Sequence, residues 1–259
     1  MSNNQRKIYV LKVGERDIPP INHLYMEENA PSRLLTCMYF WCILDAQGPI
    51  LVDHGFSRQT LRDLKISFRM EAEPPELLRR IGVDVQDVRT VILTHLHWDH
   101  YSGEEFFPRA TYYVQKKEME FVVSPLIRYR ALGRFFNPAA IEKIVHLHLQ
   151  GKVEILDGDR ELFPGIECLW TGGHSPGCMA VAAKMPSGTT VICSDVVPRY
   201  QNLEENIPCG IHTCAIEAAL ALEKVRAKAG SIDRIITGHD PAAMEKFTKV
   251  AEGVFLAAG

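Results

Sequence analysis

The sequence contains no pair of cysteines with the spacing Cys-x-x-Cys, although it has seven cysteines among its 259 residues. An odd number of cysteines without that spacing encodes neither a disulfide framework nor a cysteine-based zinc site. We therefore expect the cysteines to be buried free thiols.

Long apolar runs and a strong charge of one sign are also missing. No window approaches the roughly 20 apolar residues of a membrane span, and the opening MSNNQRKIYVLKVG lacks the apolar core of a signal peptide. With 29 basic and 32 acidic residues, the formal net charge is -3, so there is no global positive field to hold nucleic acid or an anionic membrane. We expect a cytoplasmic protein that acts on a small molecule and binds neither nucleic acid nor membrane; a homodimer remains open.

Apolar residues are plentiful enough for a core. The sequence is 46% hydrophobic and 24% charged, and segments with strand and helix patterns alternate along it without repeats. These patterns predict an α/β protein. The expected strands are 7–13, 37–44, 50–53, 90–94, 111–115, 153–156, 166–170, 180–183, 190–193 and 232–237; the expected helices lie within 57–69, at 75–81, from a cap at Thr213 to Ala229, and after Asp240-Pro241 at the end.

The segment THLHWDH, residues 94–100, follows the apolar run 91–93 and has the pattern His-x-His-x-Asp-His. In a turn after a strand, His95 and His97 can face one position while Asp99 and His100 face a second, and one ion would be crowded by all four. The spacing therefore favours two metal ions.

Three more ligand-type residues follow predicted strands or their loops. His174 lies in the loop TGGHSPG, Asp195 follows the strand ending at Cys193, and His239 follows the strand ending at Thr237. Strand ends in α/β layouts tend to face a common crevice. Imidazole and carboxylate groups together suit zinc, iron or manganese, and two such ions about 3.5–4 Å apart can share a hydroxide.

In this order, the motifs HLHWDH, GHSP, SD and GHD resemble those of the metallo-β-lactamase superfamily, and within it most closely the N-acyl-homoserine-lactone lactonase group. The resemblance covers nearly the whole chain and implies an αβ/βα sandwich in which two mixed sheets are flanked by helices. It implies that one ion, most readily Zn²⁺, is held by His95, His97 and His174, the other by Asp99, His100 and His239, with Asp195 bridging both.

The implied activity is hydrolysis of a small cyclic ester, a lactone, by a hydroxide shared between the two metals. Asp99 would carry the proton to the leaving group. Two other hydrolases stay open, one acting on a cyclic amide or β-lactam and one on a thioester in the manner of glyoxalase II. A non-catalytic metal-binding scaffold is the alternative of a different class.

Two of the departures from the family pattern concern residues that could act at the site. Asp53-His54-Gly55 stands where the family usually has Asp-Thr-Gly, so we expect Asp53 to orient a ligand while His54 is an addition. Some lactonases place a tyrosine three residues after the bridging aspartate to contact the substrate carbonyl, but this chain has Pro198 there. Tyr200, two residues later, is the candidate catalytic replacement.

The chain is expected to form one domain, 1–259, with a helical insertion at about 118–150 that selects the substrate. The insertion combines arginines, among them Arg134, with aromatic residues that would line a lid over the metals. The candidate substrate-binding residues are Phe121, Tyr129, Phe135 and Phe136. The alternative is ordinary core packing of the rings with solvated arginines.

Overall fold

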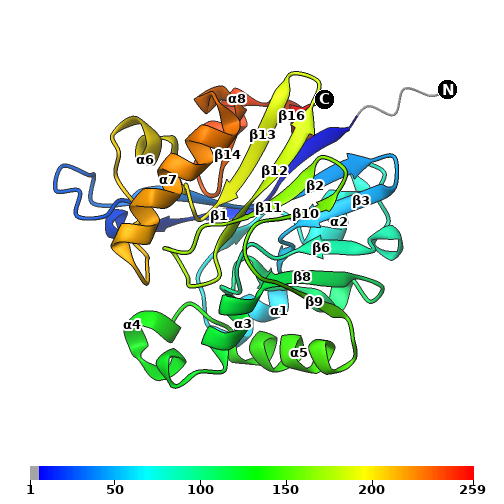
Figure 1. Cartoon of the computed structure of the whole chain (residues 1–259), viewed down its shortest axis with the longest axis horizontal. Helices are drawn as coiled ribbons and strands as arrows, with labels where there is room; N and C mark the ends of the chain where they lie inside the picture. Colours follow the sequence, from blue (N-terminus) through cyan, green and yellow to red (C-terminus); the bar gives the residue numbers. More distant parts are fainter. Residues whose placement is uncertain (1–5) are drawn as a thin grey trace.

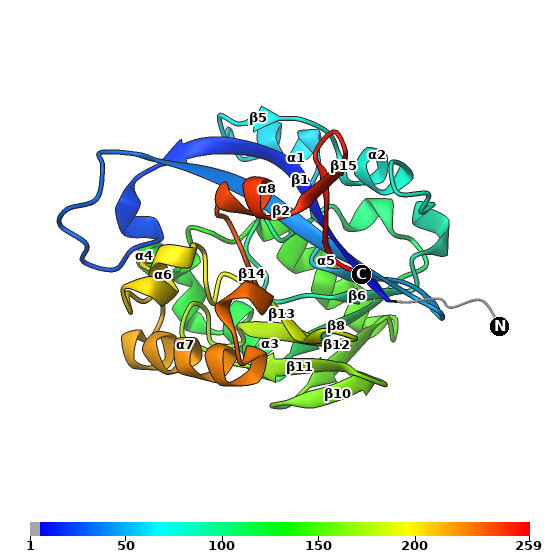
Figure 2. The same cartoon turned by 90° about the horizontal axis from the view of Figure 1, so that it is seen from above.

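Two β-sheets face each other, and helices cover the outer face of each sheet (Figures 1 and 2). This computed structural model describes residues 6–259, apart from the side chain of Glu104. The layers are those of the expected αβ/βα sandwich. No helix in the described part of the chain is both long and apolar enough to cross a membrane.

The larger sheet is mixed. Its first strands run antiparallel and carry on into a parallel set from β3 onward. In spatial order it contains β15 (Thr248–Ala251), β16 (Val254–Ala258), β1 (Lys7–Ile18), β2 (Leu34–Asp45), β3 (Gly48–Val52), β6 (Thr90–Ile92), β8 (Thr111–Gln115) and β9 (Val153–Leu156), with the short β5 (Arg69–Met70) also paired to β1.

The smaller sheet is antiparallel except for its last pair, β13 and β14. It contains β10 (Arg160–Phe163), β11 (Ile166–Trp170), β12 (Met179–Met185), β13 (Gly188–Ser194) and β14 (Ile235–Thr237). Two further short strands, β4 (Gly55–Phe56) and β7 (Tyr101–Ser102), pair in parallel near the first histidine cluster.

Strand β2 shows how the sequence separates the layers. Successive side chains of a strand point to opposite faces, and here both faces are apolar. Phe40 and Cys42 pack toward the helices, whereas Tyr39 and Trp41 pack between the two sheets. All four are essentially fully buried. The apolar run in this strand therefore holds two separate cores together.

The helices divide between the two outer faces. Helices α1 (Arg58–Asp63), α2 (Pro74–Arg79), α3 (Lys116–Val122), α4 (Arg130–Gly133) and α5 (Pro138–Leu149) contribute to the core on the larger sheet. Helix α7 (Ala215–Ala229) packs on the smaller sheet and ends at Gly230, whose φ of 69° suits glycine. The short helices α6 (Tyr200–Glu204) and α8 (Ala242–Lys246) lie near α7 (Figure 1). Residues 118–150 are thus mostly helical, and a 3₁₀ turn, η4 (Pro125–Arg128), lies between α3 and α4.

The C-terminus differs from expectation. The predicted final helix after Asp240 is only the short α8, although Asp240 Oδ1 does accept a hydrogen bond from the amide of Ala242 at 3.0 Å. The chain then forms the β15–β16 hairpin, in which β16 pairs with the free edge of β1.

Two smaller corrections concern the boundaries of predicted elements. Cys214, not Thr213, precedes α7. A 3₁₀ turn, η5 (Ile232–Arg234), replaces the first half of the predicted strand 232–237.

Candidate metal centre

The predicted ligand residues converge at one edge of the sandwich. His95 follows β6 of the larger sheet, whereas Asp195 and His239 follow the parallel strands β13 and β14 of the smaller sheet. His174 lies in the loop after β11. The two sheets therefore each supply part of one cluster.

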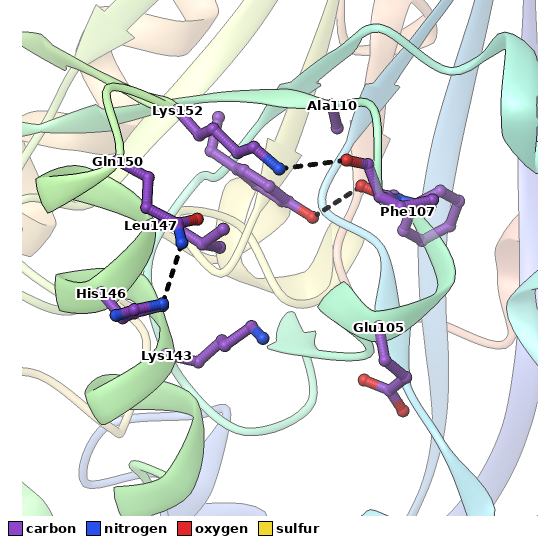
Figure 3. A pocket seen from close by; sticks show the side chains of 10 residues that line it. Glu105, Phe107, Ala110, Lys143, His146, Leu147, Gln150 and Lys152 are labelled. Atoms are coloured by element: carbon purple, nitrogen blue, oxygen red, sulfur yellow. Dashed lines mark hydrogen bonds between the residues drawn. The ribbon is translucent and has the colours of Figure 1, made fainter.

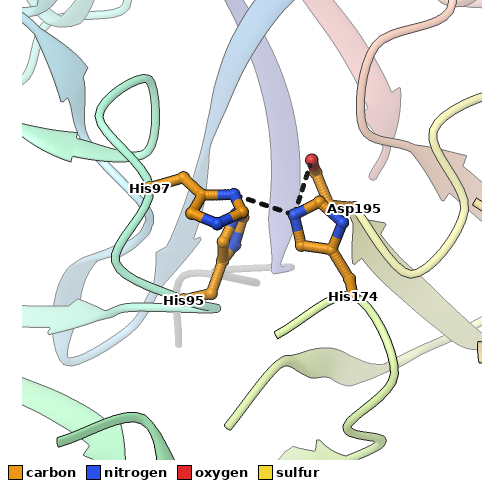
Figure 4. Close-up of side chains that lie close together, drawn as sticks. All are labelled: His95, His97, His174 and Asp195. Atoms are coloured by element: carbon orange, nitrogen blue, oxygen red, sulfur yellow. Dashed lines mark hydrogen bonds and ion pairs between the residues drawn. The ribbon is translucent and has the colours of Figure 1, made fainter. Parts of the chain in front are cut away.

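The first group consists of His95, His97, His174 and Asp195, whose ligand atoms all lie within 4.8 Å of one another (Figure 4). His174 Nε2 lies 2.9 Å from His97 Nδ1 and 3.2 Å from Asp195 Oδ2. Three imidazoles and one carboxylate at this separation match the space that one transition-metal ion occupies.

The second group consists of Asp99, His100 and His239, also within 4.8 Å of one another. Asp195 connects it to the first group: while its Oδ2 faces His174, its Oδ1 lies 3.1 Å from His100 Nε2 and 2.8 Å from His239 Nε2. One carboxylate thus presents an oxygen to each of two adjacent ligand sets. The structure brings together all seven side chains that the sequence singled out.

Backbone carbonyls orient two of the rings so that Nε2 points inward. His174 Nδ1 and His239 Nδ1 donate to the backbone carbonyls of Ile211 and Cys37, each at 2.8 Å. A ring nitrogen that is held by a carbonyl leaves the other nitrogen free to bind a metal, an arrangement common at metal sites. The local backbone therefore prepares these two histidines for coordination.

The protonation states also suit a metal. Burial lowers the pKa of His95 and His97, with further lowering from neighbouring histidines, so both rings keep a lone pair. Burial alone would raise the pKa of Asp195, but His239, His100 and His174 outweigh it and hold that pKa well below its usual range. His95 Nε2 is buried and has no hydrogen-bond partner among residues 6–259, a costly state that a bound cation would relieve. The donor set fits divalent transition metals.

Asp53 lies behind the centre, as expected of an orienting residue. Its Oδ2 lies 2.8 Å from His100 Nδ1 and accepts a 2.8 Å hydrogen bond from Thr94 Oγ1, while its Oδ1 accepts from the Thr94 amide at 2.7 Å. Asp53 and Ser194, which contact each other, both have positive φ, 57° and 47°. Such left-handed backbone at non-glycine residues often occurs at functional sites.

The sequence patterns did not identify Glu118, which is fully buried on α3. Its Oε1 accepts from the amide of Leu96 at 3.0 Å, and its Oε2 accepts from Ser175 Oγ at 2.7 Å and the amide of Gly177 at 2.9 Å. It therefore ties the loop of His95 and His97 to the loop of His174. The only sequence signal is one acidic residue among others on a helix, which does not distinguish it from exposed Glu120.

A pocket of about 250 Å³ opens onto the centre and includes His97, Asp99, Asp195 and His239 in its lining. The rest of its wall is largely apolar, with contributions from Ile18, Met38, Ile66, Trp98 and Phe135. Space beside the ligands together with an apolar wall is typical of a small-molecule site.

The four predicted lid residues occupy different environments. Phe135 lines the pocket, and its ring centroid lies 5.4 Å from that of His97. Phe136 is buried with its ring centroid 4.6 Å from that of His97, and it also contacts Phe121, which belongs to the core on the larger sheet. Tyr129 is 64% exposed and does not line the pocket. The structure places Phe121 in the core and Tyr129 at the surface, so neither of these two predicted residues lines the pocket.

Tyr200 does not take the place of the missing tyrosine. Its hydroxyl donates to the carbonyl of Ile235 at 3.0 Å, at the start of β14, whereas His239 lies beyond the other end of that strand. Four residues at a rise of about 3.3 Å each separate the two positions by roughly 13 Å. The proposed catalytic role of Tyr200 is corrected: α6 begins at this residue, and its ring packs away from the pocket.

His23 is a pocket residue that the sequence did not indicate. It is buried, its ring stacks on that of His239 at 5.2 Å with an interplanar angle of 16°, and its Nδ1 has no partner among the described residues. Burial lowers its pKa well below the usual value, so the ring is neutral. His23 lies in INHLY, without a strand end or ligand motif beside it, so no local signal marks it.

A second cavity of about 360 Å³ lies between α5 and the loop before β8 (Figure 3). Its polar lining includes Lys143, His146 and Lys152, and Lys152 Nζ donates to the carbonyl of Pro108. None of the seven clustered ligand residues lines it. The pocket at the metal centre is therefore the candidate functional site.

Comparison with known proteins agrees with this geometry. A family model described as the Metallo-beta-lactamase superfamily matches residues 36–239, which include all seven clustered ligand residues. Among curated relatives, N-acyl homoserine lactonase AiiA of Bacillus thuringiensis subsp. kurstaki is 28% identical over 229 residues, covering 81% of this chain and 84% of that protein. N-acyl homoserine lactonase AttM of Rhizobium radiobacter is 27% identical over 181 residues, covering 68% and 66% respectively.

Solved structures share the fold. A quorum-quenching N-acyl homoserine lactone lactonase superimposes with a TM-score of 0.77 at 24% identity, covering 96% of this chain and 98% of that one. AidC, described as a dizinc quorum-quenching lactonase in complex with a product, gives a TM-score of 0.73 at 15% identity, covering 93% and 90%. The predicted αβ/βα sandwich is confirmed.

Proposed function

The chain belongs to the metallo-β-lactamase superfamily, and we propose that it is a dinuclear metal-dependent hydrolase that opens a lactone ring. The observation that carries the proposal is the position of Asp195, with one oxygen toward His174 and the other toward His100 and His239. A carboxylate in that position serves two ions at once. The names of the curated relatives, N-acyl homoserine lactonases, favour a lactone over a β-lactam or a thioester.

In this proposal one ion would be held by His95, His97 and His174 and the other by Asp99, His100 and His239, with Asp195 available to both. Zinc is the favoured metal because the donor set is nitrogen and oxygen and because the fold neighbour AidC is described as dizinc. Two divalent cations held there supply a hydroxide nucleophile at neutral pH and stabilise negative charge on a carbonyl oxygen.

The chain's own residues position the substrate and move the proton. Asp99 lines the pocket, and its side chain retains 13% exposure, so it can reach both the centre and a bound substrate. Its Oδ2 lies 3.7 Å from His100 Nε2 and 3.9 Å from His239 Nε2. We assign to Asp99 the transfer of a proton to the leaving alkoxide, because it is the most exposed carboxylate of the cluster. The apolar wall with Phe135 excludes water from the rest of the substrate.

A substrate panel tests the proposal. Zinc-loaded protein is assayed with an N-acyl homoserine lactone, an unsubstituted γ-lactone, a β-lactam and a glutathione thioester, with Asp195→Ala as the control that removes the shared carboxylate. We expect ring opening of lactones, slower or no turnover of the other two, and loss of activity and of bound metal in Asp195→Ala. Thioester turnover without lactone turnover would favour the glyoxalase-like alternative, and a zinc-loaded protein inert to all four would favour the scaffold.

A further inference from the structure

Two arginines line the same pocket as the metal centre and have no carboxylate partner among the residues that the structure describes. Arg16 extends from β1, and Arg134 follows the end of α4. Within residues 6–259, neither guanidinium makes an ion pair or a side-chain hydrogen bond. Because arginine presents five N–H donors in a rigid fork, two unpaired guanidinium groups beside one cavity are a strong source of anion attraction.

The carboxylates next to Arg16 in the sequence are already engaged by other cations. Glu15 pairs with Lys12 at 2.8 Å and with Arg69 at 3.3 Å, and Asp17 pairs with Arg69 at 3.3 Å. Arg16 is half-buried on the opposite side of the strand from these two neighbours, where it faces the pocket. Its charge is therefore not compensated locally.

Arg134 is exposed, and its guanidinium lies over a ring of the pocket wall. Its guanidinium carbon lies 4.6 Å from the ring centroid of Phe135, which itself lines the pocket and contacts the His97 ring. A guanidinium stacked on an aromatic face keeps its edge N–H groups free for a ligand. This contact places the cation beside the pocket and does not consume its hydrogen-bonding capacity.

With two metal ions bound, the rest of the pocket would not offset the charge of the arginines. Asp99 and Asp195 are the acidic residues in its lining, and two divalent cations would outweigh their charges. Asn22 adds a side-chain amide without a hydrogen-bond partner in the described part of the chain, and His23 is neutral. A loaded site would therefore present positive potential from the metals and from the arginines in one pocket.

We propose that Arg16 and Arg134 bind a carboxylate on the part of the substrate that does not react, so that the substrate is an acidic lactone. This inference rests on the proposed function, since it names the class of lactone that the same site accepts. An N-acyl homoserine lactone carries no net charge and would leave both guanidinium groups unpaired. The apolar residues of the same pocket would contact the carbon skeleton that links ring and carboxylate.

A matched pair of lactones tests the proposal: γ-butyrolactone bearing a carboxylate at the γ carbon, and the same ring bearing a carboxamide. We expect kcat/KM of the zinc-loaded enzyme to be about tenfold or more higher for the acid, since a single charge-assisted contact contributes on this order. Arg16→Gln and Arg134→Gln should each remove most of that preference, by raising KM for the acid much more than KM for the carboxamide. Arg130→Gln is the control, because Arg130 is an exposed arginine at the start of α4, four residues before Arg134, and lies outside the pocket.

A binding measurement separates this inference from the proposed function. The ring-opened forms of the two lactones, a diacid and its monoamide, are titrated into zinc-loaded protein by calorimetry. Tighter binding of the diacid that disappears in Arg16→Gln supports the arginine site even if neither ring is opened, an outcome that would refute lactone hydrolysis alone. Ring opening of both lactones at equal rates, with equal binding of the two products and no effect of either arginine variant, would overturn the proposal and show that the arginines are solvated.

Discussion

Asp53 Oδ2 lies 2.8 Å from His100 Nδ1, and neither side chain has exposed surface. The carboxylate fixes the ring so that Nε2 faces Asp195. This carboxylate–histidine pair is a way in which proteins orient metal ligands and raise their basicity.

Replacing Asp53 with asparagine should therefore weaken metal binding by roughly 10–100-fold, although Asp53 does not face the centre itself. The amide keeps the size of the side chain but loses the charge that supports His100. Competition with a chromophoric chelator measures the change. Unaltered zinc affinity in Asp53→Asn would show that His100 is held by other contacts.

Glu118 offers a second test, because it joins the two loops that carry His97 and His174. In Glu118→Gln an amide NH₂ replaces one of the oxygens that accept from Leu96, Ser175 and Gly177. The new N–H donor would be buried against groups that are themselves donors. This mismatch should lower the free energy of unfolding by roughly 1–3 kcal/mol and lower metal occupancy. Denaturant unfolding and metal analysis measure both effects. Glu120→Gln on the exposed side of the same helix should change neither. Equal behaviour of the two variants would show that Glu118 does not hold the two ligand loops together.

Sequence patterns were sufficient for the ligand set and insufficient for the groups around it. His95, Asp195 and His239 were recognisable because each follows an apolar strand, and strand ends meet at one edge of a sheet. Glu118 and His23 reach the site only through tertiary packing, which leaves no periodic signal. Tyr200 was misassigned because distance along the chain does not report the direction in which a helix points its side chain.

The same distinction applies to the fold. Strands with strong local patterns, such as β8 and β11, have the predicted bounds. The β15–β16 hairpin was missed because polar and apolar residues do not alternate clearly in β15, which is largely exposed. The hairpin is stabilised by pairing of β16 with β1, from the opposite end of the chain. Tertiary pairing of this kind overrides local propensity.

His54 makes the stability of the protein depend on pH. Burial lowers its pKa from 6.5 to about 3, so the unfolded chain binds a proton below pH 6.5 that the folded chain binds only near pH 3. Its contribution to the free energy of unfolding is complete above pH 6.5. As the pH falls from 6.5 toward 3, that contribution decreases by up to roughly 1.4 kcal/mol per pH unit.

His54→Thr, which installs the residue that the family usually has there, should flatten this dependence. Unfolding free energies of both metal-stripped proteins, measured from pH 7 to pH 4, give the comparison. The difference between their slopes isolates His54 from the other histidines. Parallel curves for the two proteins would mean that His54 is protonated equally in the folded and unfolded states.

Phe135 and Phe121 should respond differently to replacement by alanine. Phe135 lines the pocket, so Phe135→Ala should change KM and substrate preference while metal content and stability stay close to those of the wild type. Phe121 is buried in the core, so Phe121→Ala should cost about 3–5 kcal/mol of unfolding free energy. Steady-state kinetics combined with denaturant unfolding measures the contrast. If Phe135→Ala lost stability without altering KM, the assignment of its ring to the substrate pocket would be wrong.

The most direct test of the two-metal account follows lactone ring opening as zinc is added back to metal-stripped protein. Because Asp195 faces both ligand sets, we predict that the rate rises to a plateau near two ions per chain and that Asp195→Ala never reaches it. A full rate at one ion per chain, or in the presence of excess chelator, would contradict the account.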